Sequence, residues 1–306
     1  MPYADRQLPE STELFLDHIA HFVPDMEAAG AALERLGYRL TPFTHQQNSL
    51  KPGEPPVPAG TANRLVMLRR GYLEFLTSVA DTPLAQQLQA AVQRYIGLHL
   101  LAFAVGDAEA AWNRLQEQGF APTPLVHLTR PVELPAGGTE DARFSVVRVP
   151  PGTMPEGRIQ MLTHYTESAV WQERWMDHPN RIEELHDVLL AVADPEEAAT
   201  RFARFLDRKA EKKGSAWHLE TDRGALSFVA PDALPDTLPG AAVPAAPFMA
   251  GYSLISADLA ASAHHFLKGG GAVEEIGSGM LKLTLPAPLG GTQIVCARGQ
   301  RAPWRG

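Results

Sequence analysis

A histidine in the middle of an apolar run is the first residue of the chain that could do chemistry. His18 lies in the stretch LFLDHIAHFVPD (14–25), seven residues before Asp25. An imidazole can act as a general acid or base near neutral pH, and it can bind a metal ion. Glu74 lies 56 residues after His18 in a second apolar run, GYLEFL (71–76). What the protein does therefore depends largely on the surroundings of His18.

The elements that hold these residues follow a repeating pattern. Four apolar strands each end at an aspartate that can cap the next helix by accepting a hydrogen bond from its first-turn amides, namely Asp25, Asp107, Asp194 and Asp258. An alanine-rich helix follows each aspartate, and about three shorter strands follow each helix. The pattern predicts an α+β fold made of four tandem βαβββ modules, of which the third and fourth are shorter.

The first module illustrates the detail of this prediction. After its helix we expect strands over 38–43, 63–69 and 72–79. The segment KPGEPPVPAGT (51–61) is rich in proline, so we expect it to lack regular structure, either as a solvated loop or as a flap over a site. The segment 168–184 separates the two halves, and we expect its tryptophans, Trp171 and Trp175, to pack it onto a domain.

The motif LDHIAHFVPDMEAAGAALERLGY (16–38), the GYLEFL motif and the paired modules together resemble the vicinal oxygen chelate superfamily, which includes glyoxalase I, extradiol dioxygenases and bleomycin-binding proteins. The resemblance covers about residues 12–298 and is strongest in the first two modules. It implies a glyoxalase-like domain over 12–166 (modules 12–83 and 84–166), a linker over 167–182, and a shorter glyoxalase-like domain over 183–298. In such folds two modules form a sheet that curls around a cavity, where a divalent metal binds to residues of their first and last strands.

The resemblance implies metal ligands at matched positions of these strands. Because side chains alternate across a strand, the residue seven before each cap aspartate marks the ligand position on each opening strand. These residues are His18, Leu100, Asp187 and Gly251. The matched positions on the last strands are Glu74, Gln160 and Ser227, with Gln293 or Ile294 in the fourth module. The first module alone offers both a histidine and a carboxylate.

Two further histidines compete for a place in this site. His164 lies four residues after Gln160 and therefore shares its face, where it could be a ligand, a general base or a substrate contact. It could equally be a solvent-exposed histidine at the end of a strand. His99 lies eight residues before its cap aspartate and should face the helix side of the sheet, unless a β-bulge turns it inward.

The function implied by the resemblance is a divalent-metal-dependent lyase, isomerase or oxygenase that acts on a small oxygenated metabolite. His18, Glu74 and Gln160 would hold Zn, Mn, Ni or Fe(II), and Glu74 and His164 would be the catalytic groups. The alternative is a small-molecule binding protein of the bleomycin-resistance type that needs no metal. At the matched ligand positions the second half keeps only one ionisable group, Asp187, so we expect this half to shape the first. This depletion argues against extradiol and hydroxyphenylpyruvate dioxygenases, whose iron lies in the third and fourth modules.

Composition narrows the class of partner. The formal net charge is −8 without a basic block, so we expect no nucleic-acid partner. No apolar run approaches the roughly 20 residues of a membrane helix, and the start of the chain lacks the blocks of a secretion signal. We therefore expect a cytoplasmic monomer or homodimer that binds a small molecule. The single cysteine, Cys296, lies in an apolar run and should be buried and inert.

Overall fold

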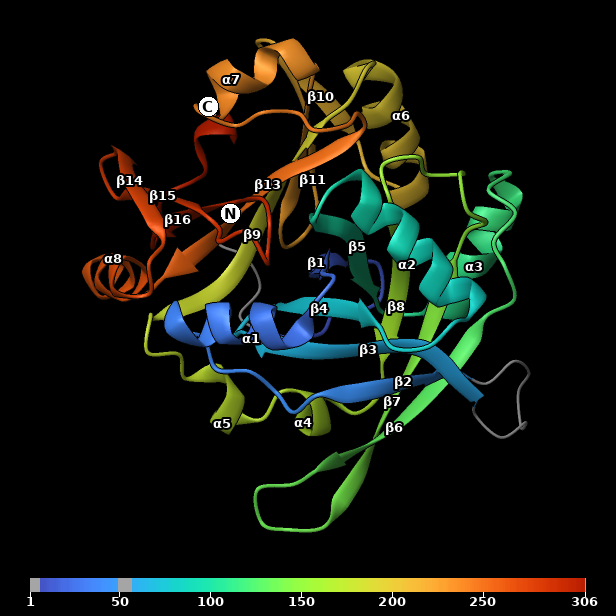
Figure 1. Cartoon of the computed structure of the whole chain (residues 1–306). Helices are drawn as coiled ribbons and strands as arrows, with labels where there is room; N and C mark the ends of the chain where they lie inside the picture. The colour runs from blue at the N-terminus through green and yellow to red at the C-terminus, as the bar shows by residue number, and fades with distance from the viewer. Residues whose placement is uncertain (1–5, 49–56, 306) are drawn as a thin grey trace.

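The computed structural model describes residues 6–48 and 57–305, and its strands form two eight-stranded mixed sheets (Figure 1). The first sheet contains β1 (Leu14–Phe22), β2 (Thr44–Asn48), β3 (Val57–Met67), β4 (Tyr72–Ser78), β5 (Gly97–Val105), β6 (Val126–Glu133), β7 (Thr139–Arg148) and β8 (Arg158–His164). The second contains β9 (Ile182–Ala191), β10 (Ala210–Lys213), β11 (Ala216–Glu220), β12 (Ala225–Val229), β13 (Phe248–Ser256), β14 (Ala272–Gly277), β15 (Met280–Thr284) and β16 (Thr292–Ala297).

Strand order confirms the predicted pairing of modules. It is β2-β3-β4-β1-β5-β8-β7-β6 in the first sheet and β10-β11-β12-β9-β13-β16-β15-β14 in the second. Within each module the opening strand runs parallel to the last strand, as β1 does to β4. The two modules of a sheet meet through antiparallel opening strands, which are β1 with β5 and β9 with β13. The predicted domain boundaries themselves stay a prediction.

The four predicted helices are present and begin at the predicted caps. They are α1 (Met26–Arg35), α3 (Ala108–Glu117), α6 (Pro195–Leu206) and α8 (Leu259–Lys268), and in each the cap aspartate accepts a first-turn amide. Helix α2 (Pro83–Arg94), which connects the first two modules, was not predicted. The shorter helices were not predicted either; they are α4 (Glu167–Val170), α5 (Glu173–Met176), η1 (Pro231–Ala233), α7 (Leu234–Thr237) and η2 (Pro303–Arg305).

One predicted strand was misplaced and one strand was missed, both at sheet edges. The strand expected over 38–43 is instead an extended connection, and β2 follows it at 44–48. Strand β10 lies in a charged run that was not read as a strand. Edge strands of natural sheets often carry polar and charged residues, so they lack the apolar alternation on which the prediction depends. In the proline-rich segment, 57–61 belongs to β3 and 51–56 lies outside the described residues.

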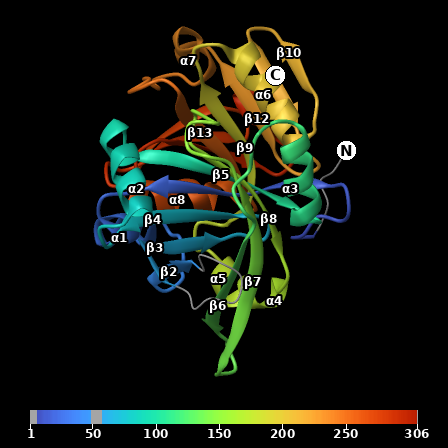
Figure 2. The same cartoon turned by 90° about the vertical axis from the view of Figure 1, so that its right-hand side faces the viewer.

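The two sheets share one core, formed by the faces that carry α1, α3, α6 and α8. Ile19, Leu73 and Phe103 of the first sheet belong to the same buried cluster as Val188 and Leu254 of the second. Figure 2 shows the two sheets packed together in the body of the molecule, with the β6–β7 hairpin extending from it. The opposite face of the first sheet is free of α1 and α3 and lies toward α4 and α5, which contact β7 and β3. This second face holds the candidate site.

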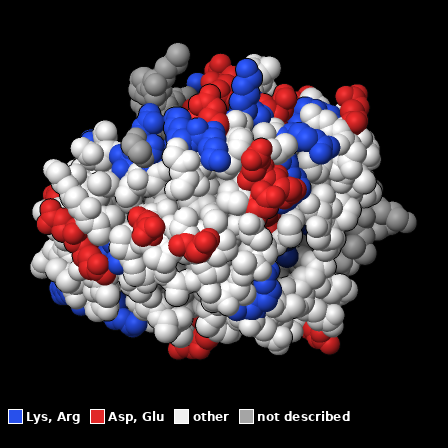
Figure 3. All heavy atoms as spheres, turned by 90° about the horizontal axis from the view of Figure 1, so that it is seen from above, with Lys and Arg blue, Asp and Glu red and all other residues white. Residues whose placement is uncertain are grey.

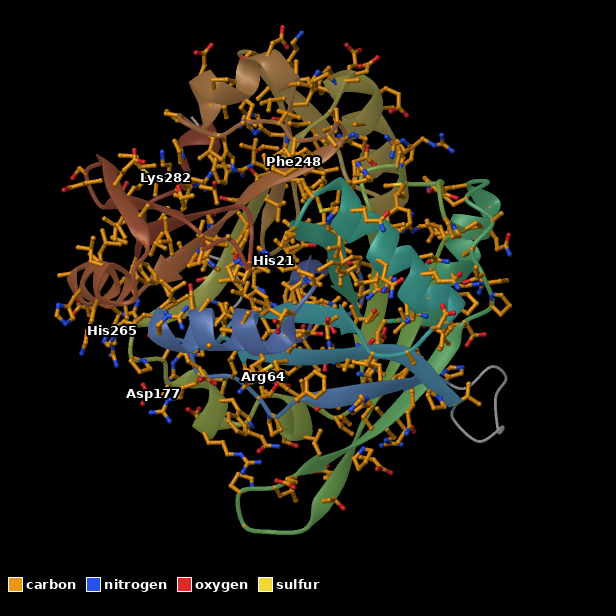
Figure 4. The ribbon with its side chains drawn as sticks, in the orientation of Figure 1. His21, Arg64, Asp177, Phe248, His265 and Lys282 are labelled. Carbon is orange, nitrogen blue, oxygen red and sulfur yellow. The ribbon has the colours of Figure 1, made fainter. Side chains whose placement is uncertain are left out.

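A buried polar network crosses between the halves. His21 of β1 contacts the backbone carbonyl of Leu289 through Nδ1 at 3.0 Å and the Tyr252 hydroxyl through Nε2 at 3.2 Å. The Gln293 amide donates to the same hydroxyl and accepts a hydrogen bond from Tyr38. Figure 4 shows His21 at the centre of the molecule, between the two halves. The buried polar groups at this seam therefore satisfy one another.

The outer surface is mixed in charge on the face that Figure 3 shows. Acidic and basic side chains are interspersed there among a larger number of uncharged residues. The net negative charge is therefore not gathered in a single patch on that face. Among the described residues, no helix is both long and apolar enough to span a membrane.

Candidate functional site

A cavity of about 340 Å³ lies on the α4–α5 side of the first sheet. Strands of both modules line it, and α4 and α5 contribute Ala169, Val170, Arg174 and Trp175. The four residues that alternation placed on one face, His18, Glu74, Gln160 and His164, all line this cavity. A volume of this size suits a small molecule. Trp171 and Trp175 thus pack against the first sheet as expected, and Trp175 also forms part of the cavity wall.

His18 is held by the residue that precedes it. The pairing of β1 with β5 shifts register between Leu16 and His18, so Asp17 forms a β-bulge and turns toward the side chain of His18. The Asp17 Oδ2 atom lies 2.7 Å from His18 Nδ1. Tyr72 stacks on the imidazole with ring centroids 4.3 Å apart. A carboxylate on Nδ1 favours the tautomer with a proton there, which leaves the Nε2 lone pair directed into the cavity.

Glu74 faces His18 across a gap. Its Oε1 atom accepts hydrogen bonds from Asn63 at 2.6 Å and Gln46 at 3.1 Å. Its Oε2 atom lies 3.9 Å from His18 Nε2. A metal ion about 2.1 Å from two donors holds those donors about 3.0–4.2 Å apart, depending on the angle at the metal. The separation of the two side chains therefore fits a metal ion between them.

Gln160 and His164 lie on β8, two strands away from β1 in the sheet. Each has a buried polar atom that makes no hydrogen bond within the described part of the chain. Among the described residues, neither Gln160 Oε1 nor His164 Nδ1 has a hydrogen-bond partner. His164 Nε2 lies 3.3 Å from Asp17 Oδ2, and its ring packs against Trp171 and Phe144. With its Nε2 proton on Asp17, His164 keeps a lone pair on Nδ1. Buried polar atoms are rarely left unpaired, so both orphan atoms point to a missing ligand.

Asp17 is the residue that sequence reasoning missed. It is fully buried and contacts both His18 and His164. Burial raises the pKa of its carboxyl, but His164 and His18 lower that pKa by more, so it lies well below its usual value. Strict alternation places Asp17 on the helix side, and the bulge brings it to the other side. A useful signal was available, because an aspartate inside a buried strand must have a partner.

Unlike His164, the competing His99 lies outside the cavity, and so does His127. His99 is buried, contacts the backbone carbonyl of Tyr95 through Nε2 at 2.8 Å and stacks on the Tyr95 ring. Burial lowers the pKa of His99 to about 4, which favours the neutral form. His127 is exposed and contacts the Ser145 hydroxyl. Neither residue lines the cavity.

The side chains in the cavity that could bind a divalent metal are few, but their chemistry suits one. Within residues 6–48 and 57–305, no group of three His, Cys, Asp or Glu side chains is placed to hold a metal ion. His18 and Glu74 are the two conventional ligands, and the third would be the orphan amide oxygen of Gln160. One imidazole, one carboxylate and one amide oxygen suit a divalent ion with open positions. The residues present therefore fit the metal that the resemblance implies.

The matched position of the second half is occupied by the chain itself. Asp187, seven residues before its cap aspartate, contacts the bulged neighbour His186 and the Ser253 hydroxyl. Arg305 of η2 reaches the same carboxylate, with Nε 3.6 Å from Oδ1, and also pairs with Glu220. Both Asp187 and Arg305 are buried. An ion pair with the C-terminal turn thus fills the site that the first half leaves open.

Paired βαβββ modules around a cavity with a histidine and a glutamate define a protein of the vicinal oxygen chelate class. The sequence profile of the glyoxalase-like domain family matches residues 16–206, which is more than half of the chain. The chain therefore belongs to the glyoxalase-like domain family, and the predicted resemblance is confirmed. A search of curated protein sequences finds no match.

Solved structures support the same fold. A hypothetical protein from Staphylococcus aureus is 11% identical, with 93% of this chain and 99% of that one covered, at a TM-score of 0.59. A mutant of 4-hydroxymandelate synthase from Streptomyces coelicolor is 15% identical, with 95% of each chain covered, at 0.54. The Mn(II)-bound glyoxalase from Novosphingobium aromaticivorans is 10% identical, with 98% and 86% covered, at 0.50. At such identities these similarities show the fold alone.

Proposed function

We propose that the first half is a divalent-metal-dependent enzyme site of the glyoxalase-like type, acting on a small oxygenated metabolite. The observation that carries the proposal is the gap of 3.9 Å between His18 Nε2 and Glu74 Oε2. Asp17 holds the far side of the imidazole, while Asn63 and Gln46 hold the other oxygen of Glu74. Two lone pairs fixed face to face repel each other unless a cation or a shared proton lies between them. A metal ion bound to both atoms would remove this repulsion.

His18, Glu74 and Gln160 would hold the ion. When bound, a divalent ion supplies a Lewis acid that polarises an oxygen atom of the substrate. Residues of the chain itself position this ion and the substrate. Asp17 orients the imidazole of His18 and sets its tautomer, as carboxylates behind metal-binding histidines commonly do. The Mn(II)-bound glyoxalase with a similar fold supports a metal of this kind.

His164 is the proposed general base. Its Nε2–H bond to Asp17 leaves the Nδ1 lone pair without a partner among the described residues, and the ring lines the cavity. A buried carboxylate behind an imidazole orients the ring and stabilises its protonated form. His164 would therefore accept a proton from the substrate at Nδ1 while Asp17 holds the opposite nitrogen. Glu74 is the second proposed catalytic group, because its carboxylate lines the cavity in which the substrate would bind.

Metal analysis of protein purified without chelator tests this proposal. We expect one divalent ion per chain and a thermal shift with at least one of Zn, Mn, Ni or Fe(II). Glu74→Gln and His18→Ala should each lower metal affinity by at least about 100-fold, since each removes one of few ligands. His264→Ala, an exposed histidine on α8, is the matched control and should bind as the wild type does.

Two results would overturn the proposal in different ways. If no ion binds and no metal shifts the melting temperature, the first half is a metal-free binding site, which the small number of conventional ligands would then explain. In that case His18 and Glu74 share a proton as an internal pair. If both substituted proteins retain the metal, the ion lies elsewhere in the chain.

A further inference from the structure

Three arginines line the cavity beside the His18–Glu74 pair. Arg130 comes from β6, Arg148 from β7 and Arg158 from β8. All three are only partly exposed, and all lie in the second module, whereas His18 and Glu74 come from the first. The cavity thus has one wall with a histidine and a carboxylate and another with three cations.

The guanidinium groups of these arginines have no direct polar partner among the described residues. Among the described residues, none of the three guanidinium groups forms a hydrogen bond or an ion pair. Arg130 lies over the ring of Phe144 at 5.5 Å, and Arg158 lies over the ring of Phe22 at 5.4 Å. The Nε atoms of Arg130 and Arg148 are buried and have no hydrogen-bond partner in the described part of the chain. Aromatic contacts satisfy little of the hydrogen-bonding capacity of an arginine, which carries five N–H donors.

The arginines also act on one another. Burial and, to a smaller extent, the like charges of Arg158 and Arg130 lower the pKa of Arg148 to about 10. The charge of Glu74 favours the protonated form of all three groups but forms no bond with any of them. Desolvated like charges without a partner are costly, so this arrangement calls for an anion. A guanidinium fork matches a carboxylate or a phosphoryl group.

The register of the strands places this cationic wall next to the proposed metal ligand Gln160. Arg148 lies directly opposite Gln160 on neighbouring strands. Arg158 precedes Gln160 by two residues on the same strand and therefore shares its face. The rest of the cavity is largely apolar, with Leu65, Met67, Leu100, Leu128, Val146 and Leu162 among its lining residues. A ligand with an anionic group and an apolar body would match both surfaces.

We propose that the cavity binds a small organic acid whose carboxylate or phosphoryl group lies on Arg130, Arg148 and Arg158 and whose oxygen-bearing carbon reaches the His18–Glu74 pair. The proposal rests on the proposed function for the role of that pair, but anion binding itself requires no metal. It adds a substrate class to the site, since a neutral metabolite would leave the three guanidinium groups without an ion-pair partner.

Calorimetric titration of the full chain, with and without divalent metal, tests the proposal with matched probes. The acid phenylacetate is compared with its neutral amide, phenylacetamide, and phenylphosphonate and inorganic phosphate provide the phosphoryl arm. We expect at least one anion to bind and phenylacetamide to bind at least tenfold more weakly than phenylacetate. Preference between the carboxylate and phosphoryl probes then identifies the anionic group.

Substitutions locate the anion. Arg148→Met and Arg130→Met keep much of the side-chain length but remove the charge, and each should weaken anion binding at least tenfold. Arg143→Met is the control, because Arg143 is exposed on the same strand as Arg148 and does not line the cavity. Both cavity variants should melt at or above the wild-type temperature without ligand, because each removes an uncompensated charge.

The outcomes separate this proposal from the metal site. If Arg148→Met weakens anion binding in metal-free protein, the anion site is supported even if no metal ever binds. Metal binding together with equal affinity for phenylacetate and phenylacetamide would retain the proposed function and overturn the anion site. Failure of all three anions to bind, or unchanged affinity in Arg148→Met, would also overturn it.

Discussion

The opening strands of the two halves carry the same pair of residues in opposite order. In β1 the bulged residue is Asp17 and the next is His18, whereas in β9 the bulged residue is His186 and the next is Asp187. Each pair is joined through a histidine Nδ1 and an aspartate Oδ2, at 2.7 Å in the first half and 2.8 Å in the second. The β-bulge and the histidine–aspartate contact therefore occur in both halves, but the two residues exchange places.

This reversal decides what each site can hold. The first half directs an imidazole toward the carboxylate of Glu74 and leaves a cavity in front of it. The second half directs a carboxylate toward Arg305, and Ser227 stands at the register position of Glu74. A cation from the chain thus neutralises the second site, while the first needs one from outside. We interpret the second half as a closed, structural copy of the first.

Removing the carboxylate of the second site should have the largest effect on stability. Asp187→Asn leaves Arg305 buried, with Glu220 as its remaining acidic partner among the described residues. We expect the free energy of unfolding to fall by about 3 kcal/mol, measured by denaturant titration, because a buried cation loses a partner. Arg305→Met, which removes the cation as well as its need for a partner, should cost less, and combining the two substitutions should recover part of the loss. Reduced metal affinity in Asp187→Asn would contradict the division between the halves.

The equivalent substitution in the first half should act on metal binding. Asp17→Asn weakens the anchor of the His18 imidazole and of His164. We expect metal affinity to fall about 10–100-fold, as is usual when the partner of a metal-binding histidine is changed. Competition with a chromogenic chelator measures this directly. His186→Asn, at the bulged position of the second half, is the matched control, and an equal loss there would show that the two halves are not chemically distinct.

Acid should weaken the seam that joins the halves. Burial lowers the pKa of His21 to about 4, against an ordinary value of 6.5. Between these values the unfolded chain binds more protons than the folded one, so stability falls as pH drops from about 6.5 to 4. His99 and His178 shift in the same direction for the same reason. His21→Gln should therefore reduce the difference in unfolding free energy between pH 7.5 and pH 5 by roughly 1–2 kcal/mol. An unchanged pH dependence would mean that His21 is already protonated in the fold.

Sequence patterns predicted the architecture because the repeated signals were local. Each cap aspartate follows an apolar strand and precedes its helix, so the four modules could be found without any long-range information. The edge strands β2 and β10 were missed because polar residues dominate them. Alternation, applied at the strand positions that the resemblance implies, also brought His18, Glu74, Gln160 and His164 to one face, and the structure places them around one cavity.

The parts of the site that escaped prediction depend on irregular or distant contacts. Asp17 reaches His18 only because β1 is bulged, and bulges leave little trace in a sequence pattern. Arg305 contacts Asp187 from the far end of the chain. Strand pairing places Arg148 opposite Gln160, and Arg130 reaches the same cavity from the neighbouring strand β6, which no spacing in the sequence reveals. Such contacts follow from the completed fold.

The smallest expected effect concerns the residue that replaces Glu74 in the second half. Ser227 is fully buried, and its hydroxyl lies 2.9 Å from Nδ1 of His218. Ser227→Ala removes this hydrogen bond and leaves His218 Nδ1 without it, at a cost of about 1 kcal/mol in the free energy of unfolding. Metal content and anion affinity should not change, because the cavity of the first half does not include Ser227. Chemical denaturation alongside metal analysis would check both expectations. A loss of metal would instead place a ligand of the ion in the second half and remove the distinction between an open and a closed site.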